Sequence, residues 1–459
     1  MASELPNAAP PTEAGSSSRG WWQFSLRTFF LLVTVLAVVL AWFSSTLERR
    51  RRAVAAIEEL GGWIEYDVEG AAISDDDWIP PAYRFPVTRV EFCNADVDAI
   101  MAHVGCFPEL RSLDFTGRRV SEESLRFLAP LTSLKELNLS EQPLSDAALA
   151  PLAGLSSLED LDLFGAQITD AGLVHLCRLP ALKQLELSDT RVGDAGMVHL
   201  RGIPALETLR LGGTQVSSGG LKSLATLPRL SALTLNRTPL GDEGLEILAQ
   251  FPSLKTLGIS RTQITDRGLA ALSQAKQIEE LWASDLPLSD QGLASLSVMP
   301  NLRRLDLENT QITDAGLVHL TRHPKLSALF LSGTCTIGPG LLHLRKLKVL
   351  YLSHTSITDP DLGYFREFNE LTYLNLRGTK ITEKGLEHLI HLRRAQVGTR
   401  DTLIPPARLR NWNLRQQHMF KVLDEWPGSI PGEDDESFLP FPPQPIGSSA
   451  PHDPFAPSP

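Results

Sequence analysis

The sequence predicts an α/β fold: a right-handed solenoid with a curved parallel sheet inside and short helices outside, preceded by an N-terminal transmembrane helix. Three observations predict it. The pattern LxxLxL recurs with a 24-residue period, an uncharged apolar run lies near the N-terminus, and the chain of 459 residues is too long for one ordinary core. A repetitive array avoids that limit, because each unit buries its apolar face on its neighbours.

Composition narrows the classes of function and of site. The formal charge of −11 argues against a nucleic-acid binder, which needs a basic surface. Four cysteines and no CxxC pair exclude a disulfide scaffold and make a structural zinc site of that kind improbable. Cys93 and Cys106 can pair in an N-terminal cap, although isolated cysteines are more often buried thiols.

The apolar run is the predicted transmembrane helix, residues 28–47. Thr28 to Ser45 contains 18 residues without a charge, which as a helix span about 27 Å at ~1.5 Å per residue, close to the ~30 Å hydrocarbon layer. Trp21, Trp22 and Trp42 suit the membrane interfaces. A cleaved signal peptide is the alternative, but the long preceding region and the lack of a small-x-small site count against it.

Arginines flank this run unequally. Arg49 to Arg52 follow the span, whereas Arg19 and Arg27 precede it. The positive-inside rule therefore favours a cytoplasmic solenoid, although large domains can cross a membrane regardless of flanking charge.

Twelve consecutive units carry the fold prediction. Eleven of them span 24 residues, and the tenth, residues 326–346, spans 21. A degenerate unit, VTRVEF, precedes them near Val87. The units begin at Leu110, Leu134, Leu158, Leu182, Leu206, Leu230, Leu254, Ile278, Leu302, Leu326, Leu347 and Leu371.

The letters of one unit explain its expected structure. LxxLxL places alternate apolar residues on one face of a short strand. Thr/Ser-Asp-x-Gly-Leu follows, where the hydroxyl can cap a short helix and the acid favours its first turn. Leucines at positions 16 and 19, such as Leu173 and Leu176, share one helical face. Neither element is stable alone, so stacking must bury both.

This pattern resembles the leucine-rich-repeat family over about residues 87–394. The 24-residue ITDxGL form is similar to bacterial membrane-anchored repeat proteins and to the repeat portion of F-box substrate receptors. Position 9 departs from many family members, which place Asn there. Eight units have Thr instead: Thr190, Thr214, Thr238, Thr262, Thr310, Thr334, Thr355 and Thr379. A Thr hydroxyl can still bond the backbone, with fewer sites than an amide.

The remaining segments are assigned by composition. We expect residues 1–27 to be disordered, 48–86 to form a juxtamembrane stalk or N-cap, and 395–426 to form a C-terminal cap. Residues 427–459 are proline-rich and acidic and should be disordered. The cap should contain an amphipathic helix that seals the last unit or docks a partner, with apolar residues at Leu409, Trp412, Met419, Phe420, Leu423 and Trp426.

No motif for catalysis is found, and we predict no enzyme, no catalytic residue, no metal site and no cofactor. Two recurring residue types are potential metal ligands. His recurs at position 18 (His175, His199, His319, His343 and His388), and Asp recurs at position 13 (Asp170, Asp194, Asp266, Asp290 and Asp314). A structural or solvated role explains the His, and helix capping explains the Asp, more simply than ion binding.

Positions 3, 5 and 7 should point away from the core onto the concave sheet. The N-terminal units place acids there: Asp114, Glu136, Asp160, Asp162 and Glu186. The C-terminal units place aromatics there: Trp282, Phe330, Tyr351 and Tyr373. Strand spacing puts Phe330 beside Tyr351 and Trp282 roughly 10 Å from Phe330. Either the aromatics anchor a partner while the acids steer its basic groups, or they only pack on one another or on the C-terminal helix.

These observations favour a single-pass membrane protein, held in the lipid bilayer by residues 28–47, that recognises a protein through its concave face. An F-box-like adaptor for protein degradation is one alternative, although residues 1–86 show no adaptor module. An envelope or carbohydrate-binding scaffold is another, and a cytoplasmic solenoid excludes it.

Overall fold

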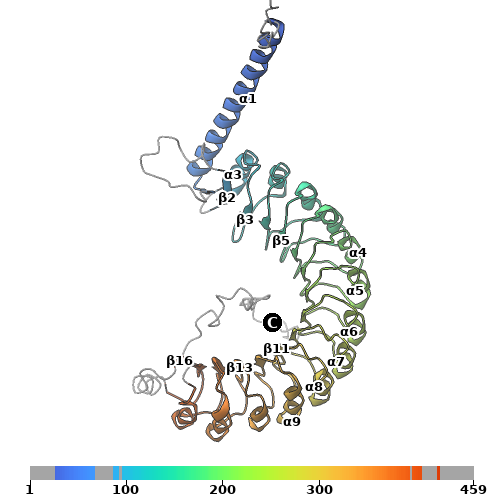
Figure 1. The fold of residues 1–459 in the computed structure, drawn as a ribbon, viewed down its shortest axis with the longest axis vertical. Coiled ribbons are helices and arrows are strands. Elements are labelled where there is room, and N and C mark those ends of the chain that lie inside the picture. Colours follow the sequence, from blue (N-terminus) through green and yellow to red (C-terminus); the bar gives the residue numbers. More distant parts are fainter. Residues whose placement is uncertain (1–25, 68–85, 93–95, 393–394, 406–420, 424–459) are drawn as a thin grey trace, which may run out of the picture.

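One continuous sheet lines the inner side of a C-shaped solenoid (Figure 1). The computed structural model describes residues 26–67, 86–92, 96–392, 395–405 and 421–423. Within these ranges sixteen strands pair in the order β1 to β16, so each strand contacts the strands next to it in sequence. β1 and β2 are antiparallel, and every later pair is parallel. The predicted α/β right-handed solenoid with its parallel sheet is therefore confirmed.

Short strands and short helices alternate along the chain. The strands are β1 Trp63–Tyr66, β2 Val87–Glu91, β3 Ser112–Asp114, β4 Glu136–Asn138, β5 Asp160–Asp162, β6 Gln184–Glu186, β7 Thr208–Arg210, β8 Ala232–Thr234, β9 Thr256–Gly258, β10 Glu280–Trp282, β11 Arg304–Asp306, β12 Ala328–Phe330, β13 Val349–Tyr351, β14 Tyr373–Asn375, β15 Gln396–Gly398 and β16 Lys421–Leu423. The α-helices are α1 Leu26–Glu59, α3 Val97–Val104, α4 Met197–Leu200, α5 Ser218–Leu224, α6 Asp242–Leu248, α7 Asp266–Leu272, α8 Asp290–Leu296, α9 Asp314–Leu317 and α10 Glu383–Leu386. The 3₁₀ helices are η1 Glu122–Leu128, η2 Asp146–Gly154, η3 Gly172–Arg178, η4 Val318–Arg322, η5 Pro339–His343, η6 Asp359–Glu367 and η7 Glu387–Leu389.

The core lies between the sheet and the outer helices. In the third unit, Leu158, Leu161 and Leu163 come from the strand region, and Leu173 and Leu176 come from η3. All five are fully buried, and the same positions are buried in the other units. Each unit therefore contributes both of its half-apolar faces to one shared core, as its letters predict.

The turn after each strand is closed by the threonine at position 9. In all eight units that carry it, the Thr hydroxyl donates a hydrogen bond to the carbonyl oxygen three residues earlier, at 2.6–2.7 Å. Thr310, for example, donates to Leu307. Threonine thus satisfies the carbonyl at position 6 within its own unit, which accounts for the absence of Asn at this position.

The residue at position 8 adopts the left-handed conformation in all twelve units. Five units have glycine there, which accepts this backbone without strain. Seven have a larger residue with φ between 53° and 61°: Glu141, Asp189, Arg237, Arg261, Asp285, Asn309 and His354. The turn geometry therefore overrides local preference at these positions.

Eight units have an aspartate at position 13, and it joins its unit to the next. Asp290 accepts hydrogen bonds from the backbone N–H of Thr313 at 2.8 Å and from its hydroxyl at 2.6 Å. Thr313 in turn caps α9 by accepting from the N–H of Ala315. The expected cap is present, and the acid does more than favour its own helix, because its carboxylate binds the cap of the following unit.

This link explains the Asp-x-Gly part of the repeat. A Cβ built on Gly316 would collide with the carboxylate of Asp290. The same collision would occur at Gly292 with Asp266 and at Gly385 with Asp359. Glycine at position 15 therefore leaves room for the aspartate of the preceding unit.

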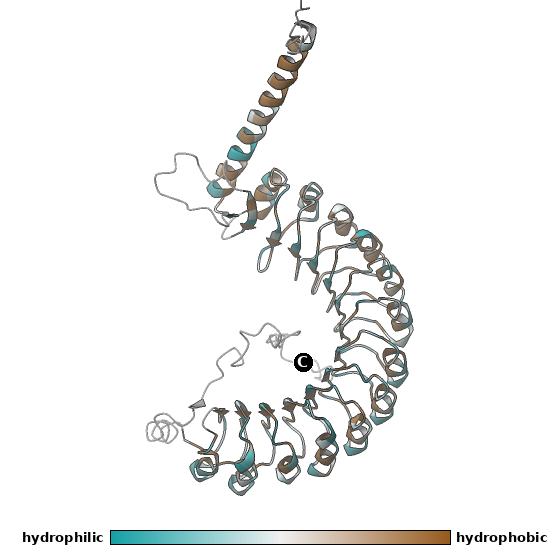
Figure 2. Cartoon of the chain, viewed as in Figure 1, coloured by the Kyte–Doolittle hydropathy of each residue, from teal (hydrophilic) through white to brown (hydrophobic). Residues whose placement is uncertain are grey.

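Helix α1 runs without interruption from the apolar run into the first layer of the solenoid (Figure 2). Its side chains from Phe29 to Phe43 are exposed, whereas Ala53, Val54 and Ile57 are buried in the core. Arg50 forms an ion pair with Glu109 at 2.5 Å. One helix therefore contains both the predicted span, residues 28–47, and the first part of the predicted stalk.

The sheet extends past residue 394, where the sequence places the end of the repeats. β15 pairs with β14, and Asp401 and Thr402 repeat the turn with its left-handed residue and its hydroxyl bond. Residues 421–423 form β16 rather than part of the predicted helix. Pairing with the open edge of β15 satisfies backbone groups that a helix would leave exposed. Residues 406–420 and 424–426 of that prediction lie outside the described residues, as do 1–25, the tail 427–459 and Cys93.

Candidate recognition surface

The concave face consists of the side chains at positions 3, 5 and 7 of each unit, which point away from the buried leucines of the same strands. Alternation along each strand places them there, because successive side chains point to opposite faces. On β5, Asp160 and Asp162 flank the fully buried Leu161. The third and fifth residues predicted from the sequence therefore lie on the inner side, in register from unit to unit.

Four aromatic rings form a continuous row on the C-terminal half of this face. Trp282 on β10, Phe330 on β12, Tyr351 on β13 and Tyr373 on β14 have successive ring-centroid distances of 5.5, 4.6 and 5.2 Å. We call these four residues the aromatic row. Ala328, Val349 and Tyr373 form a small buried cluster there, separate from the main core, against which Phe330 and Tyr351 pack.

The row is more tightly packed than strand spacing predicts. Strand spacing predicts roughly 10 Å between Trp282 and Phe330, because β11 runs between their strands. Their rings are 5.5 Å apart, so the long side chains lean toward each other across β11. Trp282, Phe330 and Tyr351 are half-buried, and Tyr373 is buried at 2% exposure. The aromatics therefore do pack on one another, and they form a firm ridge instead of separate exposed rings.

The unit that contains β11 carries charges at all three inner positions, which the sequence analysis did not single out: Arg304 and Asp306 on the strand and Glu308 just after it. Arg304 pairs with Glu280 of β10 at 3.6 Å. Asp306 stands in register with Trp282 and Phe330, between their strands. Burial, and then the negative charge of Glu308, raises the pKa of Asp306 to about 7. The letters RLDLE from Arg304 to Glu308 already placed these charges at positions 3, 5 and 7, so reading every strand would have found them.

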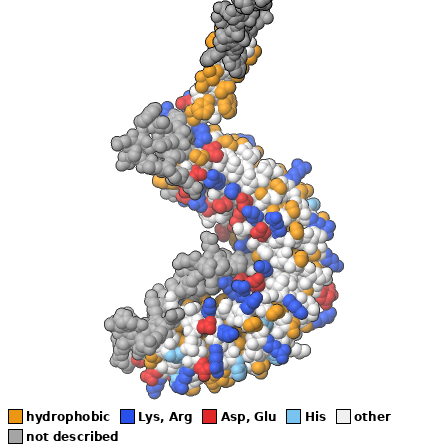
Figure 3. Space-filling model, in the orientation of Figure 1, with side chains coloured by type: hydrophobic (Ala, Val, Ile, Leu, Met, Phe, Trp, Pro, Cys, Tyr) orange, Lys and Arg blue, Asp and Glu red, His pale blue; other side chains and the backbone are white. Residues whose placement is uncertain are grey.

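The predicted acids of the N-terminal half lie together on the same face, where acidic and basic side chains are interspersed (Figure 3). Asp160 is the register neighbour of Glu136, and Asp162 is the register neighbour of Glu186. Asp114 and Glu136 are exposed, and the other three are half-buried. Burial raises the pKa of Asp160, Asp162 and Glu186.

A basic residue that the sequence analysis missed lies beside these acids. Arg210 on β7 pairs with Glu186 at 3.8 Å, and its charge lowers the pKa of Asp160, Asp162 and Glu186 against the effect of burial. The N-terminal zone is therefore partly neutralised, which weakens its steering field.

Position 5 also has a structural task. Its side-chain oxygen accepts a hydrogen bond from the backbone N–H two residues later, which ties the end of the strand into the turn. Asp114, Asp162, Glu186 and Asp306 do this with carboxylates, and Asn138 and Asn375 do it with amides. Part of the acidic recurrence therefore serves the fold, and an amide can replace the carboxylate in this task.

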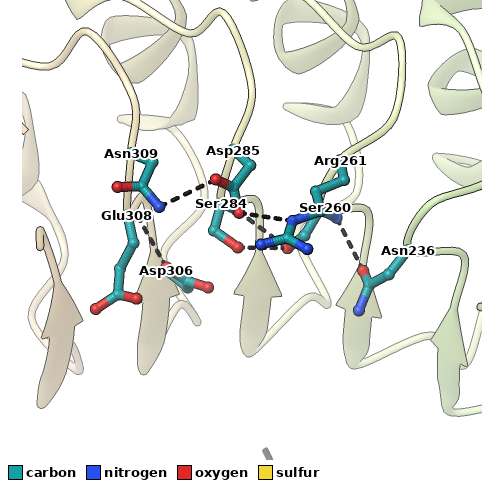
Figure 4. Close-up of polar contacts among 8 residues, drawn as sticks. All are labelled: Asn236, Ser260, Arg261, Ser284, Asp285, Asp306, Glu308 and Asn309. Carbon is teal, nitrogen blue, oxygen red and sulfur yellow. Dashed lines mark hydrogen bonds and ion pairs between the residues drawn. The ribbon is translucent and has the colours of Figure 1, made fainter. Parts of the chain in front are cut away.

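Polar side chains connect neighbouring turns along one rim of the concave face (Figure 4). Asp285 accepts from the guanidinium Nε of Arg261 at 3.0 Å and from the amide of Asn309 at 3.0 Å. Ser260 accepts from the hydroxyl of Ser284 at 2.9 Å and donates its backbone N–H to Asn236. The three position-8 side chains thus hold adjacent units at a fixed spacing beside Asp306 and Glu308.

The residues weighed as metal ligands do not gather into such a site in the described ranges, where no group of three His, Cys, Asp or Glu could hold an ion. His175, His199, His319 and His388 are half-buried on the outer side, and His343 is exposed. The thiol of Cys106 is free and half-buried, and burial raises its pKa.

Comparison with known proteins places the chain among repeat proteins. The family model described as Leucine Rich repeat matches residues 154–177, 252–273 and 298–320. No curated protein sequence matches the chain.

Solved structures of other proteins are similar to the chain at low identity and with TM-scores below 0.5. An internalin of Listeria monocytogenes is 22% identical over 67% of this chain and 89% of its own, with a TM-score of 0.48. A leucine-rich-repeat protein of Leptospira interrogans is 17% identical over 70% and 91%, with a TM-score of 0.45. TLR13, solved in complex with ssRNA13, is 20% identical over 71% and 48%, with a TM-score of 0.46.

Proposed function

The chain belongs to the leucine-rich-repeat family, and from this premise we propose that it is a single-pass membrane protein that recognises a protein partner on its concave face. Repeats of this family typically serve recognition rather than catalysis. The observation that carries the proposal is the aromatic row. The half-buried rings of Trp282, Phe330 and Tyr351, packed in a row that ends on the buried Tyr373, supply the rigid apolar anchors that dominate protein interfaces.

The surroundings of the row support a protein partner. The concave face places the apolar ridge next to the charged side chains of Glu280, Arg304 and Asp306 on β10 and β11. Apolar anchors with polar neighbours are typical of protein interfaces. The rim bonds of Asp285 to Arg261 and Asn309 support the same view, because they fix the spacing of the units beneath the ridge.

Membrane anchoring is supported by α1. It is the one helix in the described ranges that is long and apolar enough to cross a bilayer. Its side chains from Phe29 to Phe43 are exposed in the described part of the chain, while Ala53, Val54 and Ile57 of its last turns are part of the core. We therefore propose an uncleaved anchor, with the solenoid on the cytoplasmic side, where Arg49 to Arg52 favour it.

The recognition test compares two double variants of the full chain. Trp282→Ala with Tyr351→Ala removes two rings of the row and should abolish capture of the partner from detergent-solubilised native membranes. Val174→Ala with Val318→Ala removes apolar side chains that are 45% and 50% exposed on the outer helices, and it should capture as the parent does. Far-UV circular dichroism should be unchanged in both. Undiminished capture by the ring variant contradicts the proposal.

The anchor is tested separately. The protein should stay in the membrane fraction at alkaline pH, and its mass should include residues 28–47. Protease added to intact cells should leave a cytoplasmic solenoid uncut. A shorter chain that begins after residue 45 contradicts the anchor, and digestion in intact cells contradicts the cytoplasmic side.

A further inference from the structure

Asp306 on β11 and Glu308 just after it differ from the other inner acids in their charged neighbours. Arg210 acts on Asp160, Asp162 and Glu186, and Arg304 acts on Glu280. By contrast, the charges that act on Asp306 are those of Glu308 and Asp285, which are both negative. Asp285 likewise raises the pKa of Glu308. Within the described chain neither Asp306 nor Glu308 forms an ion pair, whereas Asp285 is paired with Arg261 at 3.0 Å.

Aromatic residues flank one of these two carboxyls, that of Asp306, on the neighbouring strands. The rings of Trp282 and Phe330 meet across β11, at the register position of Asp306. The faces of such rings attract cations, Trp most strongly, and carboxylates do so by charge. The rings and two carboxyl groups that form no ion pair within the described chain together form a surface that complements a positive side chain.

Two buried polar atoms on the neighbouring strand β10 indicate which hydrogen-bonding groups the ligand has. The indole Nε1 of Trp282 and the carboxylate Oε2 of Glu280 have no hydrogen-bond partner within the described chain. Buried polar atoms are nearly always paired, so such orphans require an explanation. An indole N–H needs an acceptor and a carboxylate oxygen needs a donor. A polypeptide backbone supplies both.

We propose that the surface formed by Trp282, Asp306, Glu308 and Phe330 takes an arginine or lysine side chain of an extended polypeptide partner. The cationic head lies against the two carboxyls and the ring faces, and the backbone of the partner lies along β10. This inference rests on the proposed function, since it names the chemistry of the partner that the aromatic row anchors.

The test uses a substitution that removes charge and keeps structure. Asp306 accepts the N–H of Glu308 through one carboxylate oxygen, and Asn138 and Asn375 perform the same task with an amide. Asp306→Asn therefore preserves this hydrogen bond, and Glu308→Gln preserves size. The matched control is Glu243→Gln with Glu246→Gln, which removes two charges from exposed positions of α6 on the outer side.

The probe is a fluorescein-labelled nonapeptide of alternating glycine and arginine, measured by fluorescence anisotropy on the full chain in detergent. Its partner probe replaces each arginine with citrulline, which keeps the shape and removes the charge. We expect the parent and the α6 control to bind the arginine peptide at least about tenfold more tightly than the citrulline peptide. The Asp306→Asn, Glu308→Gln variant should bind both peptides equally.

Three results overturn the inference. The first is that the parent shows no preference for the arginine peptide, or binds neither peptide. The second is that the α6 control loses the preference as fully as the Asp306→Asn, Glu308→Gln variant, which indicates general charge attraction, and the third is that this variant keeps the preference. The proposed function fails separately. If the ring variant loses its native partner while the parent shows no arginine preference, the aromatic row is still an anchor and the cationic ligand is wrong.

Discussion

Asp290 of one repeat accepts two hydrogen bonds from Thr313 of the next, one from its backbone N–H at 2.8 Å and one from its hydroxyl at 2.6 Å. The bond joins helix caps of neighbouring units on the outer side, while the strands join them on the inner side. A unit is thus held to its neighbour at both faces of the core.

We predict that Asp290→Ala lowers the free energy of unfolding by about 1–3 kcal/mol, because it leaves two donors of Thr313 without their charged acceptor. Urea unfolding of the full chain in detergent measures the change. Asp290→Asn keeps one acceptor oxygen and should lose less. Glu246→Ala, on the exposed side of α6, serves as the control and should change stability by less than about 0.5 kcal/mol. Equal losses in all three variants would contradict the inter-repeat role.

A second prediction concerns the turn threonine. Thr310 is 5% exposed and donates to the carbonyl of Leu307 at 2.6 Å. Thr310→Val keeps the shape but leaves that carbonyl without its donor, so we expect a loss of about 1–3 kcal/mol. Thr310→Ser keeps the hydroxyl and should lose less, even though it removes a methyl group. If Ser proves as harmful as Val in the same unfolding experiment, packing rather than hydrogen bonding explains the threonine.

The repeat period was enough to predict the sheet, because LxxLxL leaves only one face that can be buried. It placed every strand from Ser112 to Asn375 and put the site residues on the inner side. It could not predict the lean of Trp282 toward Phe330, which depends on side-chain rotamers across an intervening strand. It also missed the Asp290 bond, because residues 23 apart in sequence become neighbours only when units stack. The sequence analysis also did not predict β16. The apolar residues there have a helical period, but residues 421–423 pair with the open edge of β15.

A third prediction uses the left-handed residue at position 8. Glu141 is exposed and has a φ of 59°, a conformation that costs a non-glycine residue roughly 1 kcal/mol. Glu141→Gly should therefore raise the free energy of unfolding by about 0.5–1 kcal/mol. The converse change, Gly165→Ala at the same position of the next unit, where φ is 68°, should lower it by a similar amount. Changes of the same sign in the two variants would show that backbone strain does not govern this turn.

The last prediction concerns the pH dependence of stability that Asp306 introduces. Its pKa in the folded chain is raised to about 7 by burial and by Glu308, whereas an unfolded Asp has a pKa near 3.9. Between these values the folded chain holds a proton that the unfolded chain has lost. Stability is therefore greatest below about pH 4 as far as this group is concerned, falls as pH rises to about 7, and is level above.

Asp306→Asn removes the titratable carboxyl and keeps an acceptor for the backbone N–H of Glu308. From pH 5 to pH 8 the parent should lose roughly 2–3 kcal/mol of stability relative to the variant, since one pKa unit corresponds to about 1.4 kcal/mol. Thermal or urea midpoints of both proteins at the two pH values measure the difference. Glu246→Gln is the control and should follow the parent, because an exposed carboxyl makes no comparable contribution. Parallel curves for the parent and Asp306→Asn would mean that Asp306 ionises freely in the folded chain.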